Sequence, residues 1–283
     1  MSAVAPATAG PVTSFVRHRP LTSFFLWFFT VGQVFAFVPV VADVPYPQAF
    51  ICLSSVVGLL LPALVITRLV DGADALRALL RSTFRWRVAP RWYVLALVAV
   101  PAAAVVLGLG LGGAPTGSPW AALVPGFALQ LVVTFVLNNW WEEVAWAGFV
   151  GVRLQEKLGS TLRASLVAGP LFALQHVSGV VGNDPVTAVV LLVVLAALTT
   201  PFRMLAGWML NRSGSVFVVG LLHAAGDAAG PGSGFGPGFL ARLYPDTVLA
   251  GTVHVVAIAL VGLVVLAATR GRLGHRADPL ARP

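Results

Sequence analysis

Long apolar runs with few charges constrain this chain more than any other feature. Of its 283 residues, 58% are hydrophobic and only 10% are charged, whereas about a quarter of the residues in an average soluble domain are charged. A chain of this length cannot shield so much apolar surface from water, so lipid must be the solvent for most of it. The sequence therefore predicts an all-α polytopic integral membrane protein, built as a helix bundle in the lipid bilayer.

Hydropathy predicts about eight transmembrane helices within one domain at 21–269. A tail of residues 1–20 precedes this domain, and a basic tail of residues 270–283 follows it. The first apolar run is longer than the usual 7–15-residue core of a signal peptide, so we interpret it as an uncleaved span. Windows of about 19 residues place the spans at residues 21–41, 49–67, 92–112, 121–150, 162–180, 186–205, 214–229 and 247–269.

The distribution of basic residues predicts the orientation of the spans. With the N-terminus in the cytoplasm, all of the 18 basic residues except Arg242 fall in cytoplasmic segments, Arg203 among them. This bias is the positive-inside tendency, and it predicts that both termini are cytoplasmic. Because the basic residues are scattered between apolar spans, we expect no nucleic-acid partner. The excess of Arg over the single Lys157, with many Ala, Val and Gly, indicates a bacterium and hence its inner (plasma) membrane.

Three polar clusters interrupt the apolar runs: Glu142-Glu143, His176, and His223 with Asp227. An ionisable side chain inside a membrane is costly, so each cluster is a candidate functional site. At about 1.5 Å per helical residue, Glu142, His176 and His223 lie roughly 16–20 Å from the cytoplasmic face, near the middle of the bilayer. We therefore expect these three side chains to converge within about 8 Å of each other and to line a cavity.

The spacing of the polar residues also predicts which way they face. His223 and Asp227 are separated by four residues and lie on one side of a helix. Glu142 and Glu143 are adjacent, about 100° apart around an α-helix, so they are not expected to face one point. One carboxylate should enter the site, and the other should have a different partner or stay protonated.

These residue types permit hydrolysis of a peptide bond by an activated water. A buried Glu beside a His can take a proton from water, and a second His, or His223 with Asp227, can stabilise the oxyanion. Alternatively, two histidines and a carboxylate can hold a divalent metal such as zinc with one position open for water. The metal candidates are Glu142, His176 and His223, and the sequence leaves both mechanisms open.

The motifs resemble those of the CPBP intramembrane proteases, also called the Abi or type II CAAX protease family. The stretch Glu142–Phe149 resembles the family's E-E-x-x-[FW]-R-G motif. Phe172–His176 is similar to F-x-x-x-H, and His223–Asp227 is similar to H-x-x-x-[ND]. Their order and spacing match over about 120–230, which we take as the protease-like core.

The resemblance implies an intramembrane endopeptidase that acts on a peptide or membrane-protein substrate in a cavity open to the cytoplasm. It implies that Glu142 and His176 activate the water, while His223 and Asp227 shape the oxyanion or metal site. The chain departs from the family at one position, because Ala147 replaces the usual arginine. Glu143 thereby loses a possible cationic partner four residues on, and its role stays open.

Two other functions fit some of the same features. An inactive protease-like scaffold, acting as an immunity or chaperone-like protein, would keep the motifs without the reaction. A proton-coupled transporter also needs carboxylates and histidines at mid-membrane depth, but its two halves should contain paired broken helices, and the sequence shows no such symmetry. Outside the motifs, we interpret Asn138 and Asn139 as polar contacts between helices, and His254 as a packing residue.

Overall fold

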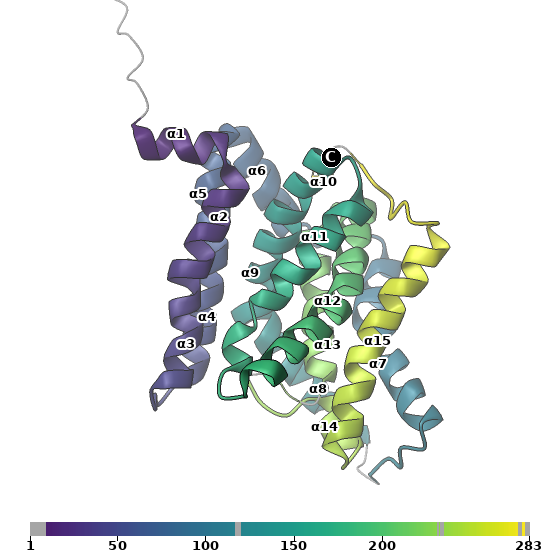
Figure 1. Ribbon diagram of the computed structural model, residues 1–283. Coiled ribbons are helices and arrows are strands. Elements are labelled where there is room, and N and C mark those ends of the chain that lie inside the picture. Colours follow the sequence, from purple (N-terminus) through teal and green to yellow (C-terminus); the bar gives the residue numbers. More distant parts are fainter. Residues whose placement is uncertain (1–9, 117–119, 231, 233–234, 277–278, 281–283) are drawn as a thin grey trace, which may run out of the picture.

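The computed structural model describes residues 10–116, 120–230, 232, 235–276 and 279–280. These residues fold into a bundle of helices, and no β-strand is found among them (Figure 1). The all-α prediction is therefore confirmed. Parts of the two predicted tails lie outside the described residues.

The helical elements carry the labels of Figure 1, with η for π-helical and 3₁₀ segments. They are α1 (Pro11–His18), α2 (Pro20–Trp27), η1 (Phe28–Gly32), α3 (Gln33–Val41), α4 (Pro47–Leu53), η2 (Ser54–Leu60), α5 (Leu61–Val70), α6 (Gly72–Thr83), α7 (Pro90–Gly110), α8 (Trp120–Thr134), η3 (Phe135–Asn139), α9 (Trp140–Glu143), η4 (Val144–Gly151), α10 (Val152–Leu158), α11 (Thr161–Leu174), η5 (Val177–Val180), α12 (Pro185–Ser213), α13 (Val216–Ala229), α14 (Phe239–Leu243) and α15 (Thr247–Ala268).

Several of these elements join into continuous apolar helices. Within the described residues, six helices are long and apolar enough to cross a membrane: Pro20–Val41, Pro47–Val70, Pro90–Gly110, Ala121–Leu158, Pro185–Ser213 and Thr247–Ala268. The chain is thus a multi-pass membrane protein. Two further apolar helices, α11 and α13, have only 14 residues each, or about 21 Å of helix. The predicted count of eight spans is not confirmed.

The helix boundaries differ from the prediction at the fifth and sixth spans. The fifth was expected over 162–180, but α11 ends at Leu174, where tighter turns lead into η5. The sixth was expected to end at 205, but α12 continues to Ser213. Arg203 therefore lies within α12, only 4% exposed, and its predicted place in a cytoplasmic segment is wrong.

Capping residues explain the sharp turns around the two short helices. Gly159 and Gly214 end α10 and α12 in the left-handed conformation, which glycine adopts without steric cost. Each is followed by a serine whose side chain accepts a hydrogen bond from the first turn of the next helix. These Gly-Ser pairs, Gly159-Ser160 and Gly214-Ser215, fix where α11 and α13 enter the bundle.

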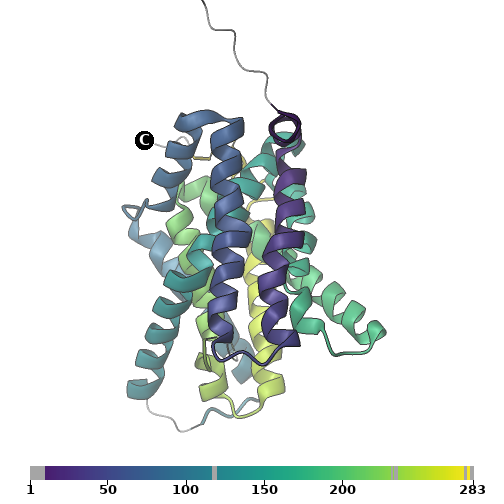
Figure 2. The same ribbon diagram turned by 90° about the vertical axis from the view of Figure 1, so that its left-hand side faces the viewer.

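The helix that carries the two glutamates lies in the middle of the bundle. The residues from Val144 to Val150 are all buried, and they form part of the main apolar core with side chains from α2, α12 and α13. The α2–α3 and α4–α5 helices pack together along one side (Figure 2). A second, smaller core joins α14 to the facing ends of α7 and α15.

The basic segments gather at one end of the bundle. In Figure 1, α1, α6 and α10 lie at the upper end together with the C-terminus, whereas α14, which carries Arg242, lies at the lower end. This grouping agrees with the predicted distribution of charge, apart from Arg203. It leads us to expect that the upper end faces the cytoplasm.

Single cysteines test this orientation in a Cys52→Ser background. Asp43→Cys places a thiol between α3 and α4, and Lys157→Cys places one on α10; both positions are exposed. In intact cells, a membrane-impermeant maleimide should label position 43, while position 157 should react only after the membrane is permeabilised. The reverse pattern would invert the orientation.

Candidate active site

The two glutamates lie on a single α-helical turn between two π-helical segments. This turn is α9, with η3 before it and η4 after it. π-Helical turns are uncommon and often occur at functional sites, because they change the angular spacing of side chains. Glu142 is 5% exposed and Glu143 is fully buried, so each carboxylate needs partners within the protein.

Glu143 is paired with Arg203. Nη1 of Arg203 donates to Oε2 of Glu143 at 3.0 Å, and Nη2 donates to Oε1 at 2.5 Å. The guanidinium thus binds both carboxylate oxygens, which is the strong two-bond geometry of arginine–carboxylate pairs. Nδ1 of His223 lies 2.9 Å from Oε1 of the same carboxylate.

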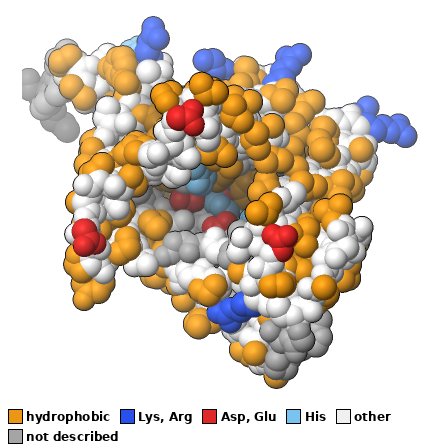
Figure 3. Space-filling model, turned by 60° about the horizontal axis from the view of Figure 1, so that its bottom comes forward, with side chains coloured by type: hydrophobic (Ala, Val, Ile, Leu, Met, Phe, Trp, Pro, Cys, Tyr) orange, Lys and Arg blue, Asp and Glu red, His pale blue; other side chains and the backbone are white. Residues whose placement is uncertain are grey.

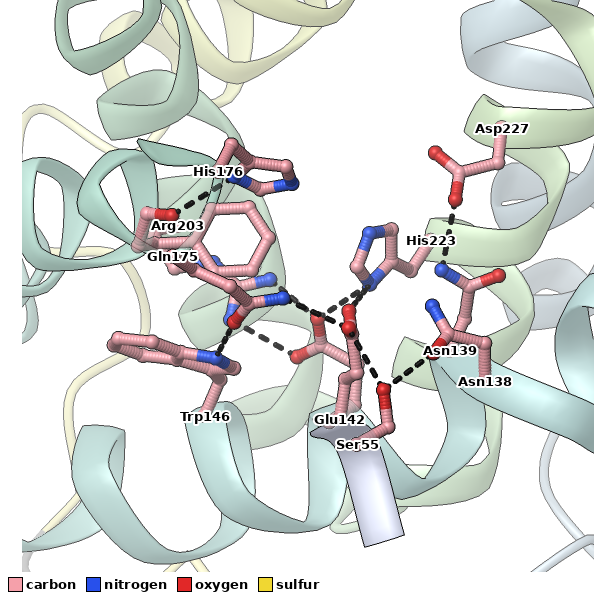
Figure 4. A network of polar contacts seen from close by, with 12 residues as sticks. Ser55, Asn138, Asn139, Glu142, Trp146, Gln175, His176, Arg203, His223 and Asp227 are labelled. Carbon is pink, nitrogen blue, oxygen red and sulfur yellow. Dashed lines mark hydrogen bonds and ion pairs between the residues drawn. The ribbon is translucent and has the colours of Figure 1, made fainter. Parts of the chain in front are cut away.

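Glu142 is held by neutral donors instead. Its Oε1 accepts hydrogen bonds from Ser55 Oγ at 3.1 Å and from Gln175 Nε2 at 2.7 Å (Figure 4). The motif residue Trp146 donates from Nε1 to Gln175 Oε1 and fixes the orientation of that amide. Among the described residues no hydrogen bond reaches Oε2 of Glu142, which lies 3.9 Å from His223 Nδ1.

Both glutamates therefore approach the same histidine nitrogen. The prediction that adjacent carboxylates cannot face one point is wrong, because oxygens of both side chains lie within 3.9 Å of Nδ1 of His223 on α13. A glutamate side chain is long enough to curve around the helix from its own Cα. Nδ1 of His223 lies close to both carboxylates but is not aligned for a hydrogen bond with either, so these contacts are ion pairs when the ring is protonated.

His176 lies just beyond the end of α11, and its side chain is exposed. Its Nδ1 is 3.1 Å from the carbonyl oxygen of Phe172, which can only accept, so Nδ1 carries the proton. In the neutral ring, Nε2 is then an acceptor. The ring of Phe172 contacts both histidines, with centroid distances of 5.2 Å to His176 and 5.7 Å to His223.

Asp227 lies one helical turn beyond His223 and has a partner of its own. Asn139 Nδ2 donates to Asp227 Oδ2 at 2.8 Å, and the neighbouring Asn138 accepts a hydrogen bond from Ser55. The two asparagines do join helices, as the sequence suggested, because they connect η3 to Asp227 on α13 and to Ser55 on η2, and Ser55 binds Glu142.

These histidines line a cavity of about 260 Å³ between α7, α11, α12, α13 and α15. Its walls are mostly apolar, and four ionisable side chains face it: His176, His223, Asp227 and His254. His254 thus borders the site, where the sequence suggested only packing. Glu142 and Glu143 are not among the lining residues, but both approach Nδ1 of His223, which lines the cavity.

The hollow opens toward the lower end of the bundle. Figure 3 turns this end toward the viewer and shows histidine and acidic side chains at its depth. The basic segments lie at the opposite end (Figure 1). The sequence predicts that the cavity and the basic segments both face the cytoplasm, but in this structure they lie at opposite ends. The cysteine-labelling experiment decides which end is cytoplasmic.

Comparison with known proteins supports the same set of motifs. Residues 124–229 match the family model described as "Type II CAAX prenyl endopeptidase Rce1-like". The match contains all three motifs and nearly coincides with the predicted core of about 120–230. Residues 124–229 therefore form a domain similar to the type II CAAX prenyl endopeptidases. Comparisons with curated proteins and with solved structures found no match.

The residues of this site do not form a metal centre as they are arranged. Within the described ranges, no three His, Cys, Asp or Glu side chains lie close enough together to hold a metal ion. The donor set predicted from Glu142, His176 and His223 therefore does not fit a metal, and no step is assigned to one here.

Several residues of this site could not be identified from the motifs. Arg203 stands alone among apolar neighbours in Pro201–Ala206, which is the same signal that identified the glutamates. Gln175 directly precedes the motif histidine. Ser55 and His254 carry no signal beyond being polar in an apolar run, because only the packing of distant helices brings them to the site.

Proposed function

We propose that this chain is an intramembrane endopeptidase in which Glu142 activates the attacking water. The observation that carries the proposal is the difference between the two glutamates. Arg203 neutralises Glu143, whereas Glu142 receives only neutral hydrogen bonds and keeps Oε2 free of them. A carboxylate that receives no hydrogen bond from an arginine, in a site of low dielectric, is the better general base.

The distance between Glu142 and His223 leaves room for the water. Oε2 of Glu142 and Nδ1 of His223 are 3.9 Å apart, and a water about 2.8 Å from both atoms fits between them. Glu142 takes a proton from this water, and the hydroxide attacks the carbonyl carbon of the peptide bond. The same proton then passes to the leaving amine nitrogen, so that hydrolysis gives a new carboxylate and a new amine.

The histidines supply the remaining groups. Nε2 of neutral His176 accepts a hydrogen bond and helps to orient the water. His223, when protonated, presents Nε2–H to the oxyanion, and such a donor strengthens as charge develops in the transition state. Asp227 lines the same cavity, and the hydrogen bond from Asn139 holds its carboxylate in place. The substrate reaches these groups from the mostly apolar cavity, which suits a membrane-associated peptide.

Peptide libraries test this function. The purified protein, in detergent and in liposomes, should cleave members of a library that contains unmodified peptides and peptides prenylated at a C-terminal cysteine. Mass spectrometry identifies the new termini, with and without a chelator. Cleavage that persists in chelator supports the glutamate–histidine mechanism, and cleavage lost to chelator and restored by zinc would replace it with a metal mechanism. If no peptide is cut, the inactive scaffold becomes the better account.

A further inference from the structure

We propose that Arg203 supplies the cation that the motif of this family places at position 147. In this chain position 147 is alanine, and Arg203 reaches Glu143 from another helix, α12. Arg203 is then a positioning residue, which holds Glu143 and through it His223. This inference rests on the proposed function for its catalytic consequence, but the pairing itself is independent of it.

The pair is buried, so Arg203 does not act at the membrane surface. Its side chain is 3% exposed and that of Glu143 is 0% exposed, so the guanidinium cannot reach lipid headgroups or water. Both of its terminal nitrogens bind Glu143. A buried charge without its partner is strongly unfavourable, so each member of this pair depends on the other.

Ala147 and Arg203 share one small space. Both line a cavity of about 20 Å³ between η4, α11 and α12, which is no larger than the space for a single water. An arginine side chain at position 147 does not fit while Arg203 is present. The small side chain of Ala147 and the arginine on α12 are therefore compensating changes: the alanine leaves the space that the guanidinium of Arg203 occupies.

The surroundings of Arg203 also connect it to His223. Its guanidinium lies over the rings of Phe172 and Phe202, at 4.4 and 4.5 Å from their centroids. Both rings contact His223, at 5.7 and 5.1 Å between centroids. Glu143 contacts the same imidazole at 2.9 Å. Three neighbours of His223 thus pack against or bind Arg203, so loss of the guanidinium should loosen the imidazole.

Moving the arginine back to position 147 tests the proposal. Arg203→Met should lower the thermal midpoint by about 10 °C and reduce kcat/KM at least about tenfold. The double variant Ala147→Arg/Arg203→Met should recover most of both losses, because the freed space accepts the new side chain beside Glu143. The matched control Ala147→Met/Arg203→Met adds similar bulk without charge and should recover neither.

The single variant Ala147→Arg should change the thermal midpoint in the opposite direction to the recovery expected of the double variant. With Arg203 still present, a second arginine has neither space nor a free carboxylate, so the midpoint should fall. Equal midpoints for the two double variants would overturn the pairing. A recovered midpoint with cleavage still lost would overturn the positioning role. If the wild-type protein cleaves no peptide, the proposed function fails, and the four midpoints alone decide whether position 147 can replace Arg203.

Discussion

Glu142→Gln is expected to reduce kcat/KM by about 10³-fold or more and to leave the thermal midpoint almost unchanged. The amide oxygen can still accept the hydrogen bonds from Ser55 and Gln175, so the fold of the site is preserved. An amide cannot take a proton from water, and a general base is typically worth 10²–10⁴-fold in rate. Steady-state cleavage of a peptide found in the library screen, together with thermal unfolding in detergent, measures both quantities.

The adjacent Glu143→Gln variant is the matched control and should show the opposite behaviour. It leaves the buried guanidinium of Arg203 without its anionic partner, and breaking such a pair costs about 3–5 kcal/mol of stability. A lower midpoint should therefore dominate its effect. A stable, inactive Glu143→Gln together with an active Glu142→Gln would exchange the roles of the two residues.

His223→Ala is expected to lower kcat by about 10²-fold or more with a smaller change in KM. Its imidazole lies between both carboxylates and the cavity, and a donor that acts on the oxyanion contributes mainly in the transition state. His254→Ala is the comparison, because His254 lines the same cavity but contacts neither glutamate by any described hydrogen bond or ion pair. Its loss should stay within about tenfold. Equal losses for both variants would argue against a special role of His223.

The sequence could predict the membrane class and the principal polar residues because these depend on local pattern. Apolar runs identify a helix bundle in lipid, and ionisable residues within such runs identify candidate site residues. The structure brings Glu142 and His223 to 3.9 Å and places His176 and His223 on one cavity, as the common depth suggested. The predicted convergence of His176 with Glu142 stays a prediction.

Other features could not be predicted because they depend on packing between distant segments. The sequence does not show that α12 continues to Ser213, so the charge pattern places Arg203 in a cytoplasmic segment instead of beside Glu143. Ideal α-helical geometry also ignores the π-helical turns around α9. The direction in which the hollow opens depends on how α7, α11, α12, α13 and α15 pack around it, and hydropathy carries no information about it.

The most direct test of the central claim is the source of the oxygen in the product. The wild-type protein should be incubated with its peptide substrate in ¹⁸O-labelled water and chelator, under single-turnover conditions, and the fragments analysed by mass spectrometry. If Glu142 activates water, the new C-terminal carboxylate should contain one ¹⁸O atom, and Glu142→Gln should yield no fragments. Cleavage by Glu142→Gln with the same label and a rate near that of the wild type would contradict the account.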